Sequence, residues 1–125
     1  MKKSWIKRRK PKAKSISQLI NLADKAFSIR IRTRDGRCLR CGKRENLQCA
    51  HIFSRSARRV RWDELNAITL CGGCHLFWAH KNPIEFTEFV QKLLGRKYAT
   101  LKKRYYTLHQ FTKPELLAII KKYEI

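Results

Sequence analysis

The sequence predicts an α+β protein in which two short strands and a helix form a small core that a metal ion holds together and that several α-helices surround. Three observations predict it: helical periodicity on both sides of a central segment, two strand-like runs within it, and two Cys-x-x-Cys pairs around them. A length of 125 residues suits one domain. We expect this domain at 15–125, with the core at about 37–81, flanking helices at about 15–34 and 83–123, and a basic arm at 1–14.

The first helix is expected from Ser15 or Ser17, either of which can cap it, to about Thr33. Its apolar residues recur at steps of three and four and form one stripe: Ile16, Leu19, Ile20, Ala23, Ala26 and Phe27. The dipeptide Asp35-Gly36 ends this helix.

The central segment holds the strand-like runs. Residues 47–53 and 68–70 read as two short strands, and the long basic connection 54–66 joins them. A further helix is expected at about 72–81.

Three more helices are expected after the central segment. Asn82-Pro83 indicates a cap with proline at the first helical position, and Gly95 ends that helix. Residues 96–108 are expected to be helical and are very basic, and a capping box at Thr112 begins the last helix. The apolar faces of the first and last of these helices are Phe86, Phe89, Val90, Leu93 and Leu94, and Leu116, Leu117, Ile120 and Tyr123.

The charge is strongly positive, with 30 Lys and Arg against 9 Asp and Glu, a net charge of +21. The commonest partner of such a field is a phosphate backbone. Residues 1–14 are rich in Lys and Arg and contain no acid, which indicates a nucleic-acid-binding arm; a solvated tail is the alternative. No stretch approaches the roughly 20 apolar residues that span a membrane, and no secretion signal is recognised. We therefore expect a cytoplasmic protein without a membrane partner.

The two Cys-x-x-Cys pairs are Cys38 with Cys41 and Cys71 with Cys74. Each pair brings two thiolates to one ion, and both pairs together complete a tetrahedral shell, so we expect a structural Zn²⁺. A redox dithiol and unrelated cysteines are the alternatives, while the lack of a secretion signal disfavours disulfides. The fifth thiol, Cys49, is expected to be buried and inert.

His51, Asn66 and His75 follow one another at intervals of 15 and 9 residues, inside and just after the loop that the four cysteines would close. A lone histidine in a strand is more often a core residue. Three such residues beside two Cys-x-x-Cys pairs in a very basic chain resemble the HNH endonucleases, also called ββα-metal nucleases. The resemblance implies a zinc-stapled, treble-clef-like ββα-metal core.

Longer strings at 22–27, 49–55 and 61–66 look like the phage recombination proteins of the lambda NinG (Rap) type, and this resemblance covers about 22–123. It implies a metal-dependent endonuclease that hydrolyses branched or recombination-intermediate DNA, such as a Holliday junction, in the cytoplasm of a bacterial host. A phage HNH nicking or packaging nuclease acting on ordinary duplex DNA is the nearest alternative. A non-catalytic zinc-binding DNA module is the other.

The HNH resemblance assigns roles to the three motif residues. His51 would activate water, Asn66 would hold the connecting loop by hydrogen bonds, and His75 would bind the catalytic divalent metal. An imidazole near its ordinary pKa suits a base at physiological pH.

Two positions depart from the family pattern. Ala50 stands where many HNH enzymes have Asp or His, and Ala79 stands where colicin-type nucleases have a second histidine. His80 lies about 140° around an α-helix from His75 and is expected to be a poor substitute. So sparse a shell favours Mg²⁺ or Mn²⁺ over catalytic zinc. Residues that the fold could bring in as further ligands are Asp63, His109 and Cys49.

Basic residues in the connection and in the segment 96–108 are candidates for phosphate contacts, with a solvated surface as the alternative for each. They are Arg55, Arg58, Arg59, Arg61, Lys97, Lys102, Lys103 and Arg104. No base-reading pattern is present among them, so we expect recognition of backbone and shape. A homodimer is left open because no interface signature supports it.

Overall fold

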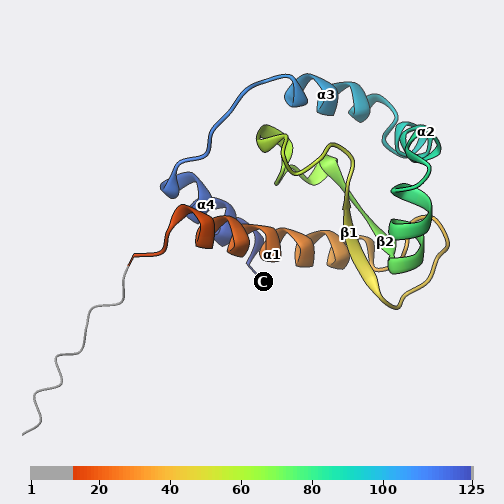
Figure 1. Cartoon of the computed structure of the whole chain (residues 1–125), viewed down its shortest axis with the longest axis horizontal. Helices are drawn as coiled ribbons and strands as arrows, with labels where there is room; N and C mark the ends of the chain where they lie inside the picture. Colours follow the sequence, from red (N-terminus) through yellow and green to blue (C-terminus); the bar gives the residue numbers. More distant parts are fainter. Residues whose placement is uncertain (1–12, 125) are drawn as a thin grey trace, which may run out of the picture.

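The computed structural model describes residues 13–124, so the predicted arm at 1–14 lies almost entirely outside the described residues. In chain order the elements are α1 (Ile16–Asp35), β1 (Leu47–His51), η1 (Arg58–Val60), η2 (Glu64–Asn66), β2 (Ala67–Cys71), η3 (Cys74–Ala79), α2 (Pro83–Leu94), α3 (Arg96–Tyr105) and α4 (Lys113–Tyr123) (Figure 1). The predicted α+β class is confirmed, with one two-stranded sheet among the helices. Among residues 13–124, no helix is both long and apolar enough to cross a membrane.

The strands β1 and β2 form an antiparallel hairpin in which Leu47 pairs with Cys71 and His51 with Ala67. The first strand ends at His51, two residues earlier than predicted, because Asn66 then takes over the pairing. The carbonyl oxygen of Asn66 accepts from the Ile52 N–H at 2.8 Å, and the side-chain oxygen of Asn66 accepts from the Phe53 N–H at 2.7 Å. The hairpin therefore leads directly into a connection that one side chain holds.

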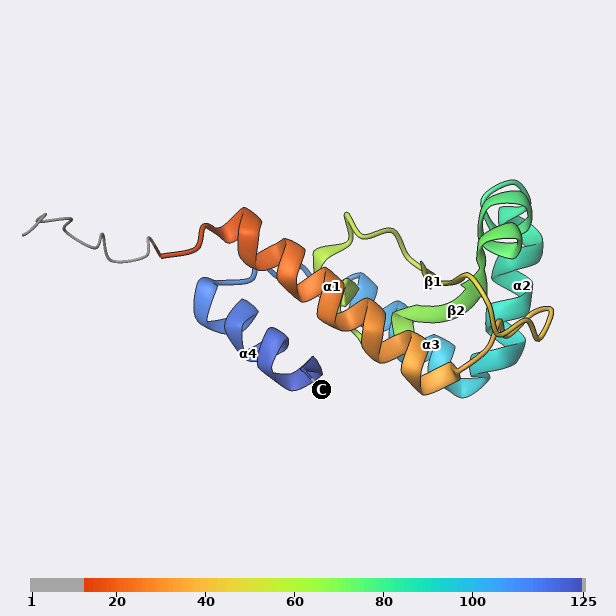
Figure 2. The same cartoon turned by 90° about the horizontal axis from the view of Figure 1, so that it is seen from below.

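Helix α1 begins and ends where its sequence signals predict. Ser15 caps it in a capping box with Gln18, and Gly36 closes it in the left-handed region, with φ of 68° and its N–H bonded to Arg32 O. Its buried stripe packs against α4, which lies alongside α1 (Figure 2). The fully or nearly fully buried residues of this core are Leu19, Ala23, Phe27, Ile31, Trp62, Ala67, Leu116 and Tyr123.

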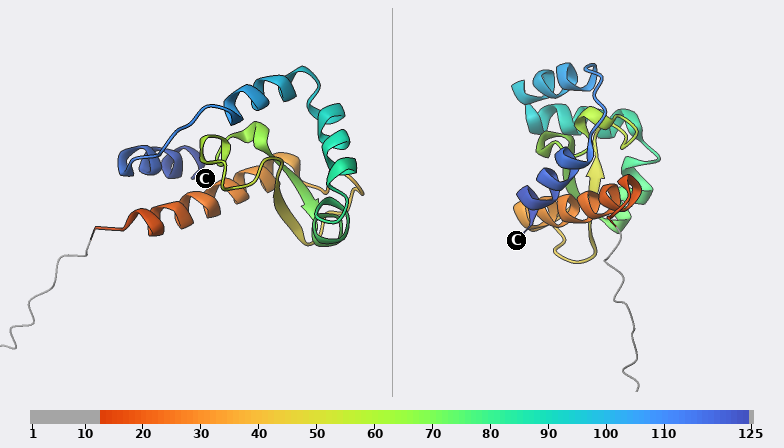
Figure 3. Two further views of the ribbon diagram at one scale, coloured as in Figure 1. Left: turned by 45° about the horizontal axis from the view of Figure 1, so that its top comes forward. Right: turned by 90° about the vertical axis from the view of Figure 1, so that its left-hand side faces the viewer.

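A second core lies at the other end of the hairpin, where η3 and α2 pack against the strands (Figure 3). Its buried members include Ile68 and Leu70 of β2, Trp78 of η3, and Phe86 and Val90 of α2. Three of the four predicted metal ligands are buried in the same cluster. The hairpin thus joins the two cores, and its edges lie where a site can form.

Several predicted positions differ in detail. Ile16, Leu93 and Leu117 belong to predicted apolar faces, but they are exposed because they lie at the margins of the buried stripes. Asn82 precedes α2 without making a side-chain cap bond. The segment predicted as a helix at 72–81 has a π-helical turn at Cys74–Ala79. This turn places His80 differently from a regular α-helix.

Candidate functional site

The four paired cysteines converge on one point. Their sulfur atoms all lie within 4.8 Å of one another, and the Cys41 and Cys71 sulfurs are 3.6 Å apart. Tetrahedral Zn–S bonds of about 2.3 Å would separate the sulfurs by about 3.8 Å, so the quartet fits zinc. The first pair lies in the tight turn after α1, and the second joins the end of β2 to the start of η3. These cysteines form a site that can hold a metal ion such as zinc.

Hydrogen-bond donors surround these sulfurs. Burial raises the pKa of the Cys38 thiol, but the backbone N–H groups of Cys41, Cys71 and Arg40 outweigh this effect and lower it to about 6. Burial raises the pKa of Cys74 to about 12, although Arg40 lies 3.6 Å from that sulfur. Four thiolates so close together repel one another, and a divalent cation is what lets all four deprotonate together.

The second feature is a cleft of about 890 Å³ that contains the histidines of the predicted motif. His51, at the end of β1, and His75, on η3, both line it. The wall from α1 includes Asp24, Ser28 and Arg32. The structure therefore brings the first and last motif residues to one surface.

His51 is held in one orientation and one tautomer. Its Nε2 lies 3.0 Å from the Arg61 carbonyl oxygen, which can only accept, so Nε2–H donates and the Nδ1 lone pair stays free. The ring also packs against Phe27, with centroids 5.7 Å apart. Desolvation by burial lowers the pKa of His51 below 6.5, contrary to the ordinary value expected from the sequence. The imidazole is therefore neutral at pH 7.

Asn66 is fully buried and acts as the loop clamp that the sequence predicts. Its side-chain oxygen accepts from the Phe53 N–H, and its side-chain amide donates to the Phe53 carbonyl at 3.0 Å. Both bonds fix the backbone two residues after His51. The clamp therefore sets the direction in which the connection leaves β1.

A second clamp comes from α1 and was not expected from the sequence. The Asp24 carboxylate accepts two hydrogen bonds from Arg61, at 2.9 and 2.6 Å, and one from the Trp62 indole at 3.0 Å. The Arg61 guanidinium, predicted to contact phosphate, is thus engaged inside the protein, with its side chain only 18% exposed. Since the Arg61 carbonyl orients His51, Asp24 fixes the position of the His51 ring from a distance. The two residues are 37 positions apart, and no local pattern indicates the contact.

His75 is oriented by Gln48, another residue that the sequence reasoning missed. Its Nδ1 lies 2.9 Å from Gln48 Oε1, which accepts, so Nδ1–H donates and Nε2 is free to bind a metal. Burial, above all, lowers the pKa of His75, and the nearby charges of His80 and His51 lower it further. The residue is therefore neutral at pH 7, as a ligand must be.

His80 lies beside His75, which the sequence analysis did not expect. Their ring centroids are 4.6 Å apart, and both residues line the cleft. The reason is the π-helical turn, in which the His80 N–H bonds to the His75 carbonyl five residues back. The 140° separation assumed α-helical geometry and is wrong here. A five-residue hydrogen-bonded turn returns the side chain to the same face.

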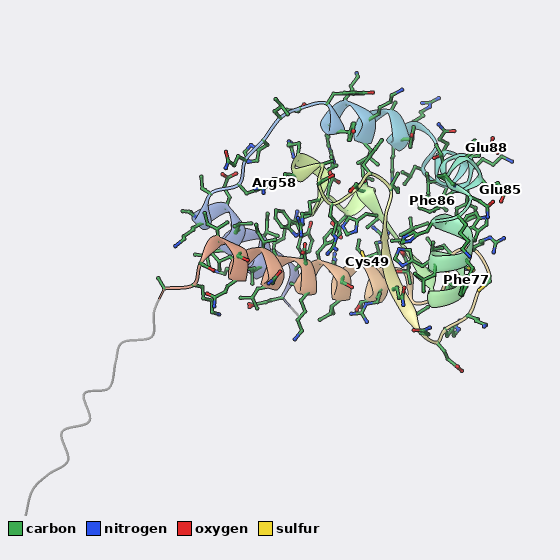
Figure 4. The ribbon with its side chains drawn as sticks, viewed as in Figure 1. Cys49, Arg58, Phe77, Glu85, Phe86 and Glu88 are labelled. Carbon is green, nitrogen blue, oxygen red and sulfur yellow. The ribbon has the colours of Figure 1, made fainter. Side chains whose placement is uncertain are left out.

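The other proposed ligands do not join His75. Asp63 is bonded to Arg104 at 2.7 Å, and His109 to Glu115 at 2.7 Å; neither lines the cleft. Cys49 does line it, between β1 and α1 (Figure 4), but burial raises its pKa to about 12. Its thiol is neutral, as an inert cysteine requires, but the residue is half-buried and not fully buried as predicted.

The candidate phosphate contacts divide between surfaces. Arg55 is at the histidine cleft, where its side chain is 60% exposed and lies 3.6 Å from the Asp24 carboxylate, and Arg58 is exposed on η1 (Figure 4). Lys102 and Lys103 are exposed on α3. The remaining three, Arg59, Lys97 and Arg104, line a different cavity.

Fold and site together define a small α+β protein with a four-cysteine metal-binding site next to a cleft that contains three histidines. The entire chain, residues 1–125, matches the family described as Bacteriophage Lambda NinG protein, and the chain belongs to this family. NinG is a protein of the recombination region of phage lambda. Searches of curated proteins and of solved structures found no match.

Proposed function

We propose that the protein is a metal-dependent endonuclease of the HNH type that hydrolyses phosphodiester bonds in DNA. One observation carries the proposal: two neutral histidines line a single cleft, each with one nitrogen held by a protein acceptor and the other nitrogen free. The free Nδ1 of His51 suits a general base, and the free Nε2 of His75 suits a metal ligand. A strongly basic chain provides the field that draws DNA to the cleft.

Each residue has one task in this proposal. His51 Nδ1 takes a proton from the attacking water, while the Arg61 carbonyl keeps the opposite nitrogen protonated. Asn66 and Asp24 keep that carbonyl and the adjoining loop in place. The exposed guanidinium of Arg55, at the edge of the cleft, binds a phosphate oxygen.

The donor atoms of the cleft suit a catalytic divalent ion, but they favour a different ion from the Mg²⁺ or Mn²⁺ expected from the sequence. His75 and His80 offer two imidazoles, whereas the carboxylate among the lining residues, Asp24, is already engaged by Arg61. Imidazole suits ions such as Ni²⁺ and Zn²⁺, while Mg²⁺ prefers oxygen ligands. When bound, such an ion would stabilise charge on the scissile phosphate and the leaving oxygen. We therefore propose His75 and His80 as its protein ligands, with Ni²⁺ more effective than Mg²⁺ or Mn²⁺.

The substrate proposed is branched DNA of a phage recombination intermediate, which the family membership supports. Ordinary duplex DNA is the alternative. Absence of a carboxylate next to the base, where Ala50 is 1% exposed, favours a second candidate function, a non-catalytic zinc-binding DNA module.

Nicking of supercoiled plasmid tests the proposal. Wild type, His51→Ala and His109→Ala would be assayed with Mg²⁺, Mn²⁺ or Ni²⁺, and zinc content and DNA affinity would be measured for each. His109 is the matched control because it is paired with Glu115 away from the cleft. We expect only His51→Ala to lose cleavage, with zinc and DNA binding retained. Cleavage that survives in His51→Ala would reject His51 as the base, and an inactive wild type would favour the binding module.

A further inference from the structure

A second cavity, of about 720 Å³, shares no lining residue with the histidine cleft. Its walls come from η1, η2, α3, α4 and the long link between the last two helices, which runs from α3 to α4 in Figure 1. The connection between the strands serves both: Ser54 and Arg55 line the histidine cleft, and Arg59 and residues 62–65 line the second cavity. The two hollows are therefore separate surfaces on one connection.

The second cavity is cationic. Arg59, Lys97 and Lys122 reach it from η1, α3 and α4, and none of the three has an ion pair among residues 13–124. Its two acids are already neutralised, Asp63 by Arg104 at 2.7 Å and Glu64 by Arg30 at 3.1 Å. The uncompensated charge of the cavity is therefore positive.

The aromatic residues of the cavity indicate which part of a nucleic acid it suits. Trp62 is 6% exposed and packs edge-on against Phe111, with centroids 5.0 Å apart. Tyr123 is also buried, and its hydroxyl donates to the Trp62 carbonyl at 2.8 Å. Since these rings are already packed, they offer no free face for stacking a base. The unpaired cations beside these packed rings suit backbone phosphates instead.

We propose that this second cavity binds the phosphate backbone of a DNA segment other than the one held in the histidine cleft. The inference rests on the proposed function in so far as DNA is the partner. Two separate cationic surfaces hold two segments at a fixed mutual position. A branched molecule supplies both segments from one substrate, whereas a linear duplex engages one surface at a time. The second cavity thus gives the protein a means to prefer branched DNA without reading bases.

The test compares two triple variants of equal charge loss. One removes the unpaired cations of the cavity, Arg59→Gln, Lys97→Gln and Lys122→Gln. The matched control removes one arginine and two lysines that are exposed elsewhere, Arg37→Gln, Lys25→Gln and Lys92→Gln. Affinities for a fluorescent four-way junction and for a linear duplex of the same total length are measured by anisotropy at several salt concentrations. No chelator and no catalytic ion are added, so the zinc stays and the DNA is not cut.

We expect wild type and control to prefer the junction and the cavity variant to bind both probes alike. The junction salt slope of the cavity variant should fall by about 2.7, the value for three lost phosphate contacts. Equal affinities of the wild type for both probes, or equal effects of the two triple variants, would overturn the inference. Binding does not depend on cleavage. If the wild type cuts plasmid but gives either of these two binding results, only this inference fails and the proposed nuclease stands. If the wild type prefers the junction but never cuts DNA, the proposed nuclease activity fails and the second DNA-binding surface stands.

Discussion

Substituting Asn66 by Ala tests the loop clamp directly. The side chain is fully buried and makes two hydrogen bonds to the backbone of one residue, Phe53. Alanine would leave that N–H and that C=O without partners. A buried polar group left unsatisfied costs about 1–3 kcal/mol, so the two groups together predict a loss of about 2–6 kcal/mol. Because small domains have total stabilities of only about 5–15 kcal/mol, a loss of this size is readily measured.

Urea unfolding of the zinc-loaded protein gives this free energy, and the chain supplies a control of the same residue type. Asn82 is exposed and makes no side-chain cap bond, so Asn82→Ala should stay within about 0.5 kcal/mol of wild type. Asn66→Asp should be at least as harmful as Asn66→Ala, since its carboxylate would face the Phe53 carbonyl. If Asn66→Ala unfolded at the same urea concentration as Asn82→Ala, the clamp would contribute nothing and the reasoning would be refuted.

Three further outcomes are expected. Cys38→Ser should lose zinc and unfold, as seen by circular dichroism and metal analysis; a folded, cooperative, zinc-free variant would contradict the role of the quartet. Asp24→Asn should loosen both Arg61 and Arg55 and slow plasmid nicking by about 10- to 100-fold without weakening DNA binding, and an unaltered rate would remove its positioning role. Nicking should fall as the pH drops through the pKa of His51, because only the neutral ring accepts a proton. Arg55→Gln should move this fall to higher pH, since the charge of Arg55 lowers that pKa; a shift to lower pH would refute the assignment.

Local signals predicted the helix ends and the metal quartet well. Ser15, Gly36 and Thr112 cap helices as their residue types indicate, because a cap depends on hydrogen bonds within a few residues. The Cys-x-x-Cys spacing is also a local signal, because two intervening residues let both sulfurs reach one ion. The four sulfurs lie close together as expected. The loop-holding role of Asn66 comes from the HNH resemblance and not from a local signal, and the resemblance does not indicate its partner, Phe53.

Contacts between distant elements could not be read in the same way. The Asp24–Arg61 clamp depends on how α1 crosses the hairpin, which no spacing in the sequence encodes. Gln48 meets His75 only because β1 and η3 pack together. The position of His80 differs from the predicted one for another reason: a π-helical turn does not have the 3.6 residues per turn of an α-helix. Arg61 was assigned to DNA from its charge alone, which cannot indicate an internal partner.

The turn that contains His75 and His80 has a consequence for comparing related chains. A π-helical turn is equivalent to an α-helix that has gained one residue, and here Phe77, 67% exposed, lies within the widened turn. A chain with one residue fewer at this point would carry its histidines four apart on a regular helix and still present both rings side by side. Alignments that treat the four-residue and five-residue spacings as different sites would therefore separate proteins that present their histidine pairs on the same face of the helix.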